Sequence, residues 1–187
     1  MRHDRPAVDA SPHARAAIDA VLDRFGPGAL RVAARAGMRI VHLAPHESYR
    51  DRSRAIRKLS SAIDDWPVPP AGLFVVQERT VYLRSTSVMT VAHEFAHALD
   101  CALGGGTYLS GADPRVRRAF QSARGFVTPY AASRLDEYFA EGLRAFVEAN
   151  DVASSWPRAT KARLKKVDAG LYAYVDRLFR VEFAAAA

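Results

Sequence analysis

The sequence has a single cysteine and no long apolar run, and each of these scarcities excludes a class of protein. Because Cys101 is the only cysteine, no disulfide can form within the chain, which excludes disulfide scaffolds and cysteine-ligated zinc fingers. No stretch approaches the ~18 apolar residues that a membrane-spanning helix needs, and the first residues lack the apolar core of a Sec signal peptide. We therefore expect a chain without a membrane anchor, which either stays in the cytoplasm or leaves the cell by a signal-independent route.

Acidic residues are also scarcer than basic ones, 20 against 27, which gives a net charge of +7. The basic runs Arg50–Lys58 and Pro157–Lys166 contain no interleaved aromatic residues of the kind that stack on bases, so we predict solvated helix surfaces and not a nucleic-acid site. With 49% hydrophobic and 25% charged residues, the composition is that of a folded domain and excludes general disorder. The 187 residues are enough for one compact domain, for which we expect a monomer.

Turn and capping residues divide the chain into helices and a few strands. Residues 1–85 predict helices and a small sheet: a helix from Ser11 to Gly26, a short helix over Leu30–Ala36, a buried strand over Met38–Leu43, a solvated helix over Tyr49–Leu59, and a hairpin of Leu73–Val76 and Thr80–Leu83. Residues 86–187 predict mainly helices: Ser87–Leu103, a helix that starts at Asp113-Pro114, a helix opened by a capping box at Ser133 and Asp136, and a last helix around Leu171–Leu178.

The clearest chemical signal is His93-Glu94-Phe95-Ala96-His97, an H-E-x-x-H pattern within an apolar run that predicts a buried helix. Histidines four residues apart lie on one helix face about 6 Å apart along the axis, so both imidazoles can bind one zinc ion. Glu94 lies beside that position, where its carboxylate can take a proton from a zinc-bound water. The pattern fixes three positions only, and it also occurs by chance in unrelated proteins.

A catalytic zinc site needs a third protein ligand, and a second apolar helix offers two candidates, Glu137 and Glu141. Buried carboxylates are costly unless they bind a metal or pair with a partner, and the alternative for both residues is a solvated helix face. The spacing itself leaves the choice between the two glutamates open.

The stretch from Val91 to Phe146 resembles the catalytic domain of anthrax lethal factor and its relatives, which include the Pro-Pro endopeptidases. Tyr130 lies seven residues before Glu137, as the family tyrosine does, and Glu137 follows His97 by about the family's usual interval. The resemblance implies a single zincin-like α+β metallopeptidase domain over residues 1–187, mostly helical, with a small mixed sheet above the HExxH helix. One departure is Ala96, where many members carry glycine.

The resemblance also implies a role for each matching residue. His93, His97 and Glu137 would bind Zn²⁺, Glu94 would be the general base, and Tyr130 would donate a hydrogen bond to the developing oxyanion. Glu141, and Asp100 in the same way, would accept the free N–H of a ligand histidine. A metzincin is excluded because Leu103 stands where its third histidine is required. A thermolysin-like enzyme is excluded because no glutamate lies between Asp100 and Asp136.

These observations predict a zinc-dependent endopeptidase that hydrolyses a peptide or protein. An extended substrate would add to the strand at Thr80–Leu83 or to its hairpin partner. The alternatives are an inactive zincin-fold binding module and a basic nucleic-acid-binding domain, but neither would need Glu94 or Tyr130. The resemblance leaves open both a bacterial toxin or effector role and a housekeeping role.

Overall fold

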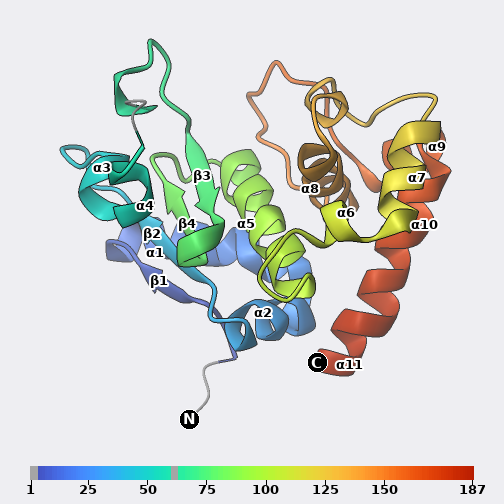
Figure 1. The fold of residues 1–187 in the computed structure, drawn as a ribbon, viewed down its shortest axis with the longest axis horizontal. Coiled ribbons are helices and arrows are strands. Elements are labelled where there is room, and N and C mark those ends of the chain that lie inside the picture. Colours follow the sequence, from blue (N-terminus) through green and yellow to red (C-terminus); the bar gives the residue numbers. More distant parts are fainter. Residues whose placement is uncertain (1–3, 60–62) are drawn as a thin grey trace.

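The computed structural model describes residues 4–59 and 63–187, and it places a four-stranded sheet beside a larger group of helices (Figure 1). The strand order is β1-β2-β4-β3, with bounds Ala7–Asp9, Arg39–His42, Thr80–Leu83 and Gly72–Val75 respectively. β1, β2 and β4 are parallel, whereas β3 runs antiparallel to β4, with Gly72 opposite Leu83 and Val75 opposite Thr80. The sheet is therefore small, as the residues predict, and mixed, as the resemblance implies. β1 was not predicted, because three residues carry too little pattern to be recognised.

Side chains alternate between the two faces of this sheet. Ile40 and Val81 belong to the main core with the helices α1 (Pro12–Leu22), α2 (Gly26–Arg35) and α5 (Val88–Leu103). Val41 and Tyr82, one position further along, belong to a smaller core with Tyr49 and Ile56. These last two residues lie on the short helices α3 (Tyr49–Arg52) and α4 (Arg54–Arg57), which cover the other face.

The single helix predicted over Tyr49–Leu59 is wrong, because the chain breaks it at Ser53. This residue is extended, with φ −108° and ψ 122°, and its hydroxyl accepts a hydrogen bond from the Ile56 N–H at 3.1 Å. Serine caps of this kind favour a new helix start over continuation.

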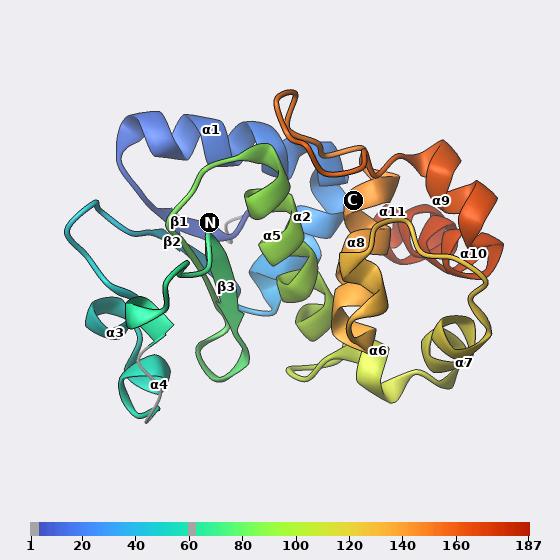
Figure 2. The ribbon, with the colours of Figure 1, turned by 90° about the horizontal axis from the view of Figure 1, so that it is seen from above.

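α5 lies between the sheet and α8 (Leu135–Phe146), and the two helices are in contact along the middle of the molecule (Figure 2). The hydroxyl of Ser87 caps α5 by accepting the Thr90 N–H at 3.2 Å, at the predicted start. The capping box predicted at Ser133 and Asp136 is wrong. Arg134 is the N-cap without a side-chain cap, and the Ser133 hydroxyl instead donates to the Tyr130 carbonyl at 2.7 Å.

Most of the remaining helices contact α8, whereas those within residues 178–186 pack against α2. The remaining helices are α6 (Leu109–Ala112), α7 (Pro114–Ser122), α9 (Lys161–Val167), α10 (Ala169–Arg177), a π-helical stretch (Leu178–Phe183) and α11 (Ala184–Ala186); short 3-10 turns lie at Asp23–Phe25, Ile63–Asp65, Val76–Glu78 and Tyr130–Ala132. Asp113 caps α7 as predicted. In the described part of the chain, no helix combines the length and the apolar character needed to cross a membrane.

Candidate metal centre

His93, His97 and Glu137 meet where α5 contacts α8, although Glu137 lies 40 positions after His97. The Nε2 atoms of the two histidines are 3.1 Å apart. Glu137 Oε2 lies 2.9 Å from Nε2 of His93 and 3.2 Å from Nε2 of His97. Three potential ligand atoms, each from a different side chain, therefore point at one position.

The arrangement fits a small divalent cation. Ligands on a tetrahedral zinc ion at ~2.0–2.1 Å are separated from one another by ~3.3 Å, close to the three distances above. With both histidines neutral, as metal binding requires, and the three glutamates Glu94, Glu137 and Glu141 ionised beside Arg144, the cluster carries a net charge of −2 that a divalent cation would balance. Two imidazoles and one carboxylate form a ligand set suited to zinc that leaves a fourth position open.

This environment shifts the pKa values of several titratable groups, among them His93 and Glu94. Burial by itself would lower the pKa of His93, but hydrogen bonds to Glu137 and Glu141 raise it to about 10. Burial raises the pKa of Glu94, while the nearby histidines act in the opposite direction. Glu94 thus lies beside the candidate ligands in a weakly hydrated position, the environment that makes a carboxylate more basic.

Tyr130 lies outside both helices of the candidate centre, in the 3-10 turn before α8. Its ring centre is 5.4 Å from that of His93, and 45% of the residue is exposed. Burial and the charge of Glu137 raise the pKa of its hydroxyl, so the group is a neutral donor at physiological pH. On the other side of the centre, Tyr108 packs against His97 with 5.7 Å between ring centres.

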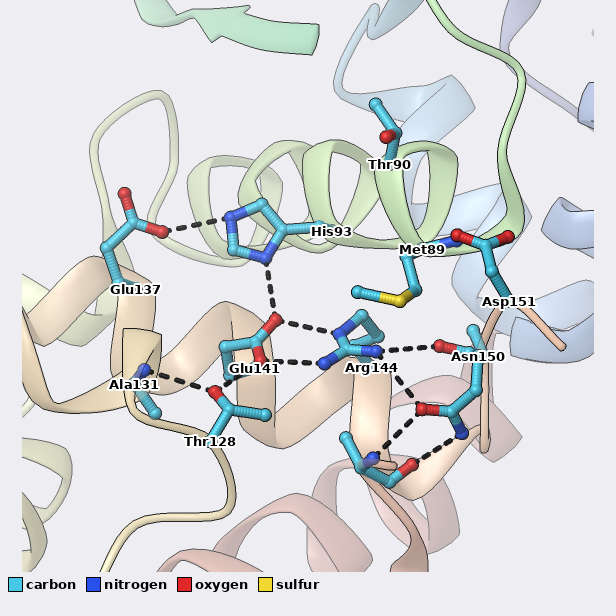
Figure 3. A network of polar contacts seen from close by, with 12 residues as sticks. Met89, Thr90, His93, Thr128, Ala131, Glu137, Glu141, Arg144, Asn150 and Asp151 are labelled. Atoms are coloured by element: carbon cyan, nitrogen blue, oxygen red, sulfur yellow. Dashed lines mark hydrogen bonds and ion pairs between the residues drawn. The ribbon is translucent and has the colours of Figure 1, made fainter. Parts of the chain in front are cut away.

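Glu141 lies beside a histidine, as the resemblance to the lethal factor family implies (Figure 3). Its Oε1 accepts a hydrogen bond from Nδ1 of His93 at 2.9 Å, and its Oε2 accepts one from the Thr128 hydroxyl at 2.6 Å. Arg144, one turn further along α8, donates to both carboxylate oxygens at 2.7 and 2.8 Å. These contacts orient the His93 ring so that Nε2 faces His97 and Glu137.

The expected contact of Asp100 with a histidine is not formed. Both oxygens of Asp100 are used by Ser110, through its N–H at 2.8 Å and its hydroxyl at 2.6 Å. Among the described residues, the buried Nδ1 of His97 has no hydrogen-bond partner. Asp100 therefore fixes α6 against the end of α5, because the first backbone N–H groups of α6 need an acceptor.

A cavity of about 290 Å³ opens beside the ligand cluster, on the side of His93 and Glu94. Its wall includes Gly72 of β3, Met89 and Thr90 of α5, Tyr130, and Trp156 from the segment after α8. The predicted base and the predicted phenol thus face the same space, which is large enough to admit a side chain.

Thr128, Arg144 and Trp156 belong to this site but were not identified from the sequence. An arginine three residues after a glutamate on an apolar helix is a recognisable signal for Arg144, because a charged side chain there requires a partner. Thr128 gives no such signal. Trp156 was interpreted as a boundary between elements because Pro157 follows it.

The architecture and the site together define a helical α+β domain with a candidate His-His-Glu metal centre. No protein-family model matches the sequence, and no curated protein matches it. Among solved structures, the chain is similar to the Pro-Pro endopeptidase PPEP-2 from Paenibacillus alvei, with a TM-score of 0.64 over 92% of this chain and 95% of that chain. The two sequences are 17% identical, so the likeness shows a shared fold.

Proposed function

We propose that this protein is a zinc-dependent endopeptidase of the lethal factor-like and Pro-Pro endopeptidase type. The observation that carries the proposal is the convergence of His93, His97 and Glu137 at one position beside Glu94, next to an open cavity. The fold shared with a Pro-Pro endopeptidase supports the same conclusion.

His93, His97 and Glu137 would hold the zinc. When bound, zinc supplies Lewis-acid chemistry, which polarises a carbonyl and lowers the pKa of a water. Glu94 would take the proton of the attacking water on its carboxylate and pass it to the leaving nitrogen. The Tyr130 hydroxyl would donate a hydrogen bond to the oxygen on which negative charge develops.

The strand pairing supports one of the two predicted sites for an extended substrate. β4 is paired on one edge with β2 and on the other with β3, so the predicted addition at Thr80–Leu83 is wrong. Within residues 4–59 and 63–187, β3 pairs with β4 alone, and Gly72 at its start lines the cavity. The free edge of β3, the hairpin partner named as the other option, would pair with the substrate main chain.

Elemental analysis and a peptide-library cleavage assay test the proposal directly. We expect one zinc per chain and cleavage at internal peptide bonds. Glu94→Gln keeps the volume and both histidines but removes the base, so the cleavage rate should fall by at least about 100-fold with zinc content unchanged. A protein that takes up no zinc at neutral pH, or a Glu94→Gln variant as active as the parent, would refute the mechanism.

A further inference from the structure

Arg144 is fully buried on α8, and its guanidinium lies between the candidate centre and the segment that follows the helix (Figure 3). On one side, Nε and Nη2 donate to the two oxygens of Glu141 in a bidentate pair. On the other side, Nη1 donates to the Ala149 carbonyl at 2.9 Å and to Oδ1 of Asn150 at 3.3 Å. A guanidinium that donates two parallel hydrogen bonds fixes the orientation of the carboxylate as well as balancing its charge. A lysine ammonium balances the charge but does not fix the orientation.

Asn150 in turn closes the base of a loop. Its Oδ1 accepts the Ala159 N–H at 2.9 Å, and its Nδ2 donates to the Ala159 carbonyl at 2.8 Å. One side-chain amide thus pairs with the backbone at the far end of residues 150–159. The next residue, Asp151, accepts the N–H groups of Val88 and Met89 at the start of α5, at 2.7 and 3.3 Å.

Trp156 lies within this loop and forms part of the cavity wall with Met89, His93 and Glu94. The loop is held at Asn150 and Asp151, both of which contact the helices of the candidate centre. Side-chain contacts therefore run from the His93 ring through Glu141 and Arg144 to Asn150, and Asn150 holds the backbone of Ala159, three residues after Trp156.

From this geometry we propose that Arg144 is a positioning residue for the peptidase reaction proposed above, on which this inference rests. It orients His93 by holding Glu141, and it holds the 150–159 loop, through Asn150, so that Trp156 walls the substrate cavity. The contact of Arg144 with Glu141 and its contact with Asn150 can be tested separately. Loss of the Glu141 contact should weaken zinc binding, whereas loss of the Asn150 contact should displace Trp156.

Zinc affinity, measured by competition with a chromogenic chelator, tests the first connection. Arg144→Met should lower the affinity by about 10- to 100-fold, the range found when groups that orient metal ligands are removed. Arg144→Lys should keep only part of the zinc affinity, because lysine restores the positive charge but not the two parallel hydrogen bonds to Glu141. Arg115→Met is the matched control: it also breaks an arginine–carboxylate pair, with the buried Asp113, but outside this network, and it should bind zinc as the parent does.

Tryptophan fluorescence tests the second connection without any need for activity. The chain has two tryptophans, so Trp66→Phe leaves Trp156 as the sole reporter. In that background, Asn150→Ala should shift Trp156 emission to the red and increase its quenching by acrylamide, while zinc affinity stays within about threefold of the parent. With a substrate from the peptide library, the same change should raise KM more than it lowers kcat.

The outcomes separate this inference from the proposed function. If the parent protein binds no zinc, the proposed function fails; if Arg144→Met binds zinc as tightly as the parent, the role of Arg144 fails alone. Should Arg144→Met not fold, the double variant Glu141→Gln/Arg144→Met removes both charges, and it should show the same loss of zinc affinity. Unchanged affinity in that double variant, or unchanged Trp156 quenching in Asn150→Ala, would overturn the inference.

Discussion

Gly72 of the edge strand β3 lies close against α5. A Cβ atom at this position would be 2.7 Å from Cγ of Glu94 and 2.9 Å from Cγ2 of Thr90, too close for either to stay in place. Because position 72 has no side chain, the predicted base Glu94 can pack directly against β3.

We expect Gly72→Ala to displace Glu94, to reduce kcat by up to about 100-fold and to lower the free energy of unfolding by about 1–3 kcal/mol. Steady-state kinetics and urea denaturation measure both effects. Gly111→Ala is the control, because a Cβ there would have no atom within 4 Å. Equal kcat in Gly72→Ala and Gly111→Ala would contradict the prediction, because it would show that displacement of Glu94 does not affect the reaction.

Tyr130 is tested by removal of its hydroxyl alone. Tyr130→Phe keeps the ring against His93 but deletes the donor to the oxyanion, and kcat should fall by about 100- to 1,000-fold. Zinc content should not change, since the hydroxyl is not among the three ligand atoms that converge. If kcat/KM is the same as in the parent, the tyrosine is a packing residue and takes no part in the reaction.

How far the sequence predicts the site depends on how local each contact is. His93 and His97 share one helix face because of their spacing, and a later apolar helix with two glutamates is visible in the residue pattern. The contact of Thr128 with Glu141 joins a loop to a helix, and no spacing rule predicts it. The same holds for Asp100, whose partner Ser110 lies on a helix of only four residues.

At the scale of elements, Glu78 connects α4 to the β3–β4 hairpin through hydrogen bonds. Its carboxylate accepts the Ser53 hydroxyl at 2.8 Å, the Ala55 N–H at 3.0 Å and the Tyr82 hydroxyl at 2.8 Å. Burial by itself would raise the pKa of Glu78, but these hydrogen bonds lower it overall.

A carboxylate with a lowered pKa in the folded state stabilises the fold above its ordinary pKa and loses that contribution as the pH falls through the lowered value. The free energy of unfolding should therefore fall on acidification from about pH 5 to pH 3, and by less in Glu78→Gln. Urea titrations of both proteins across this range provide the measurement. Identical pH profiles would show that Glu78 keeps its ordinary pKa.

Long, strongly patterned elements were predicted well, and short ones were not. α5 and the hairpin follow from sixteen apolar-rich residues with a serine cap and from two β-rich runs around a turn. Ser53 splits the predicted Tyr49–Leu59 helix, and Arg134 replaces the predicted cap of α8. In both places a serine hydroxyl makes a local hydrogen bond, Ser53 with the Ile56 N–H and Ser133 with the Tyr130 carbonyl, and the residue pattern does not specify these partners.

At the scale of the whole molecule, zinc should stabilise the fold because its candidate ligands come from two helices that contact each other. At a free zinc concentration of ~1,000 times Kd, binding to the folded state alone contributes about 4 kcal/mol. For a chain of this length that corresponds to a Tm about 8–16 °C higher with zinc than with a chelator. Differential scanning calorimetry measures the shift, and His97→Ala should abolish it. A Tm that does not respond to zinc in the parent would contradict a shared site.

The packing of α2 against the C-terminal helix has a consequence for synthesis on the ribosome. Gly28 lets the two helices meet at the backbone, since a Cβ there would lie 1.8 Å from the Phe183 carbonyl oxygen. Arg31 contacts the Ala187 carbonyl across 156 positions, which take roughly 8–30 s to translate at ~5–20 residues per second. During that time the face of α2 around Gly28 and Arg31 lacks its partner from residues 178–187, so these contacts form only after that segment has been translated.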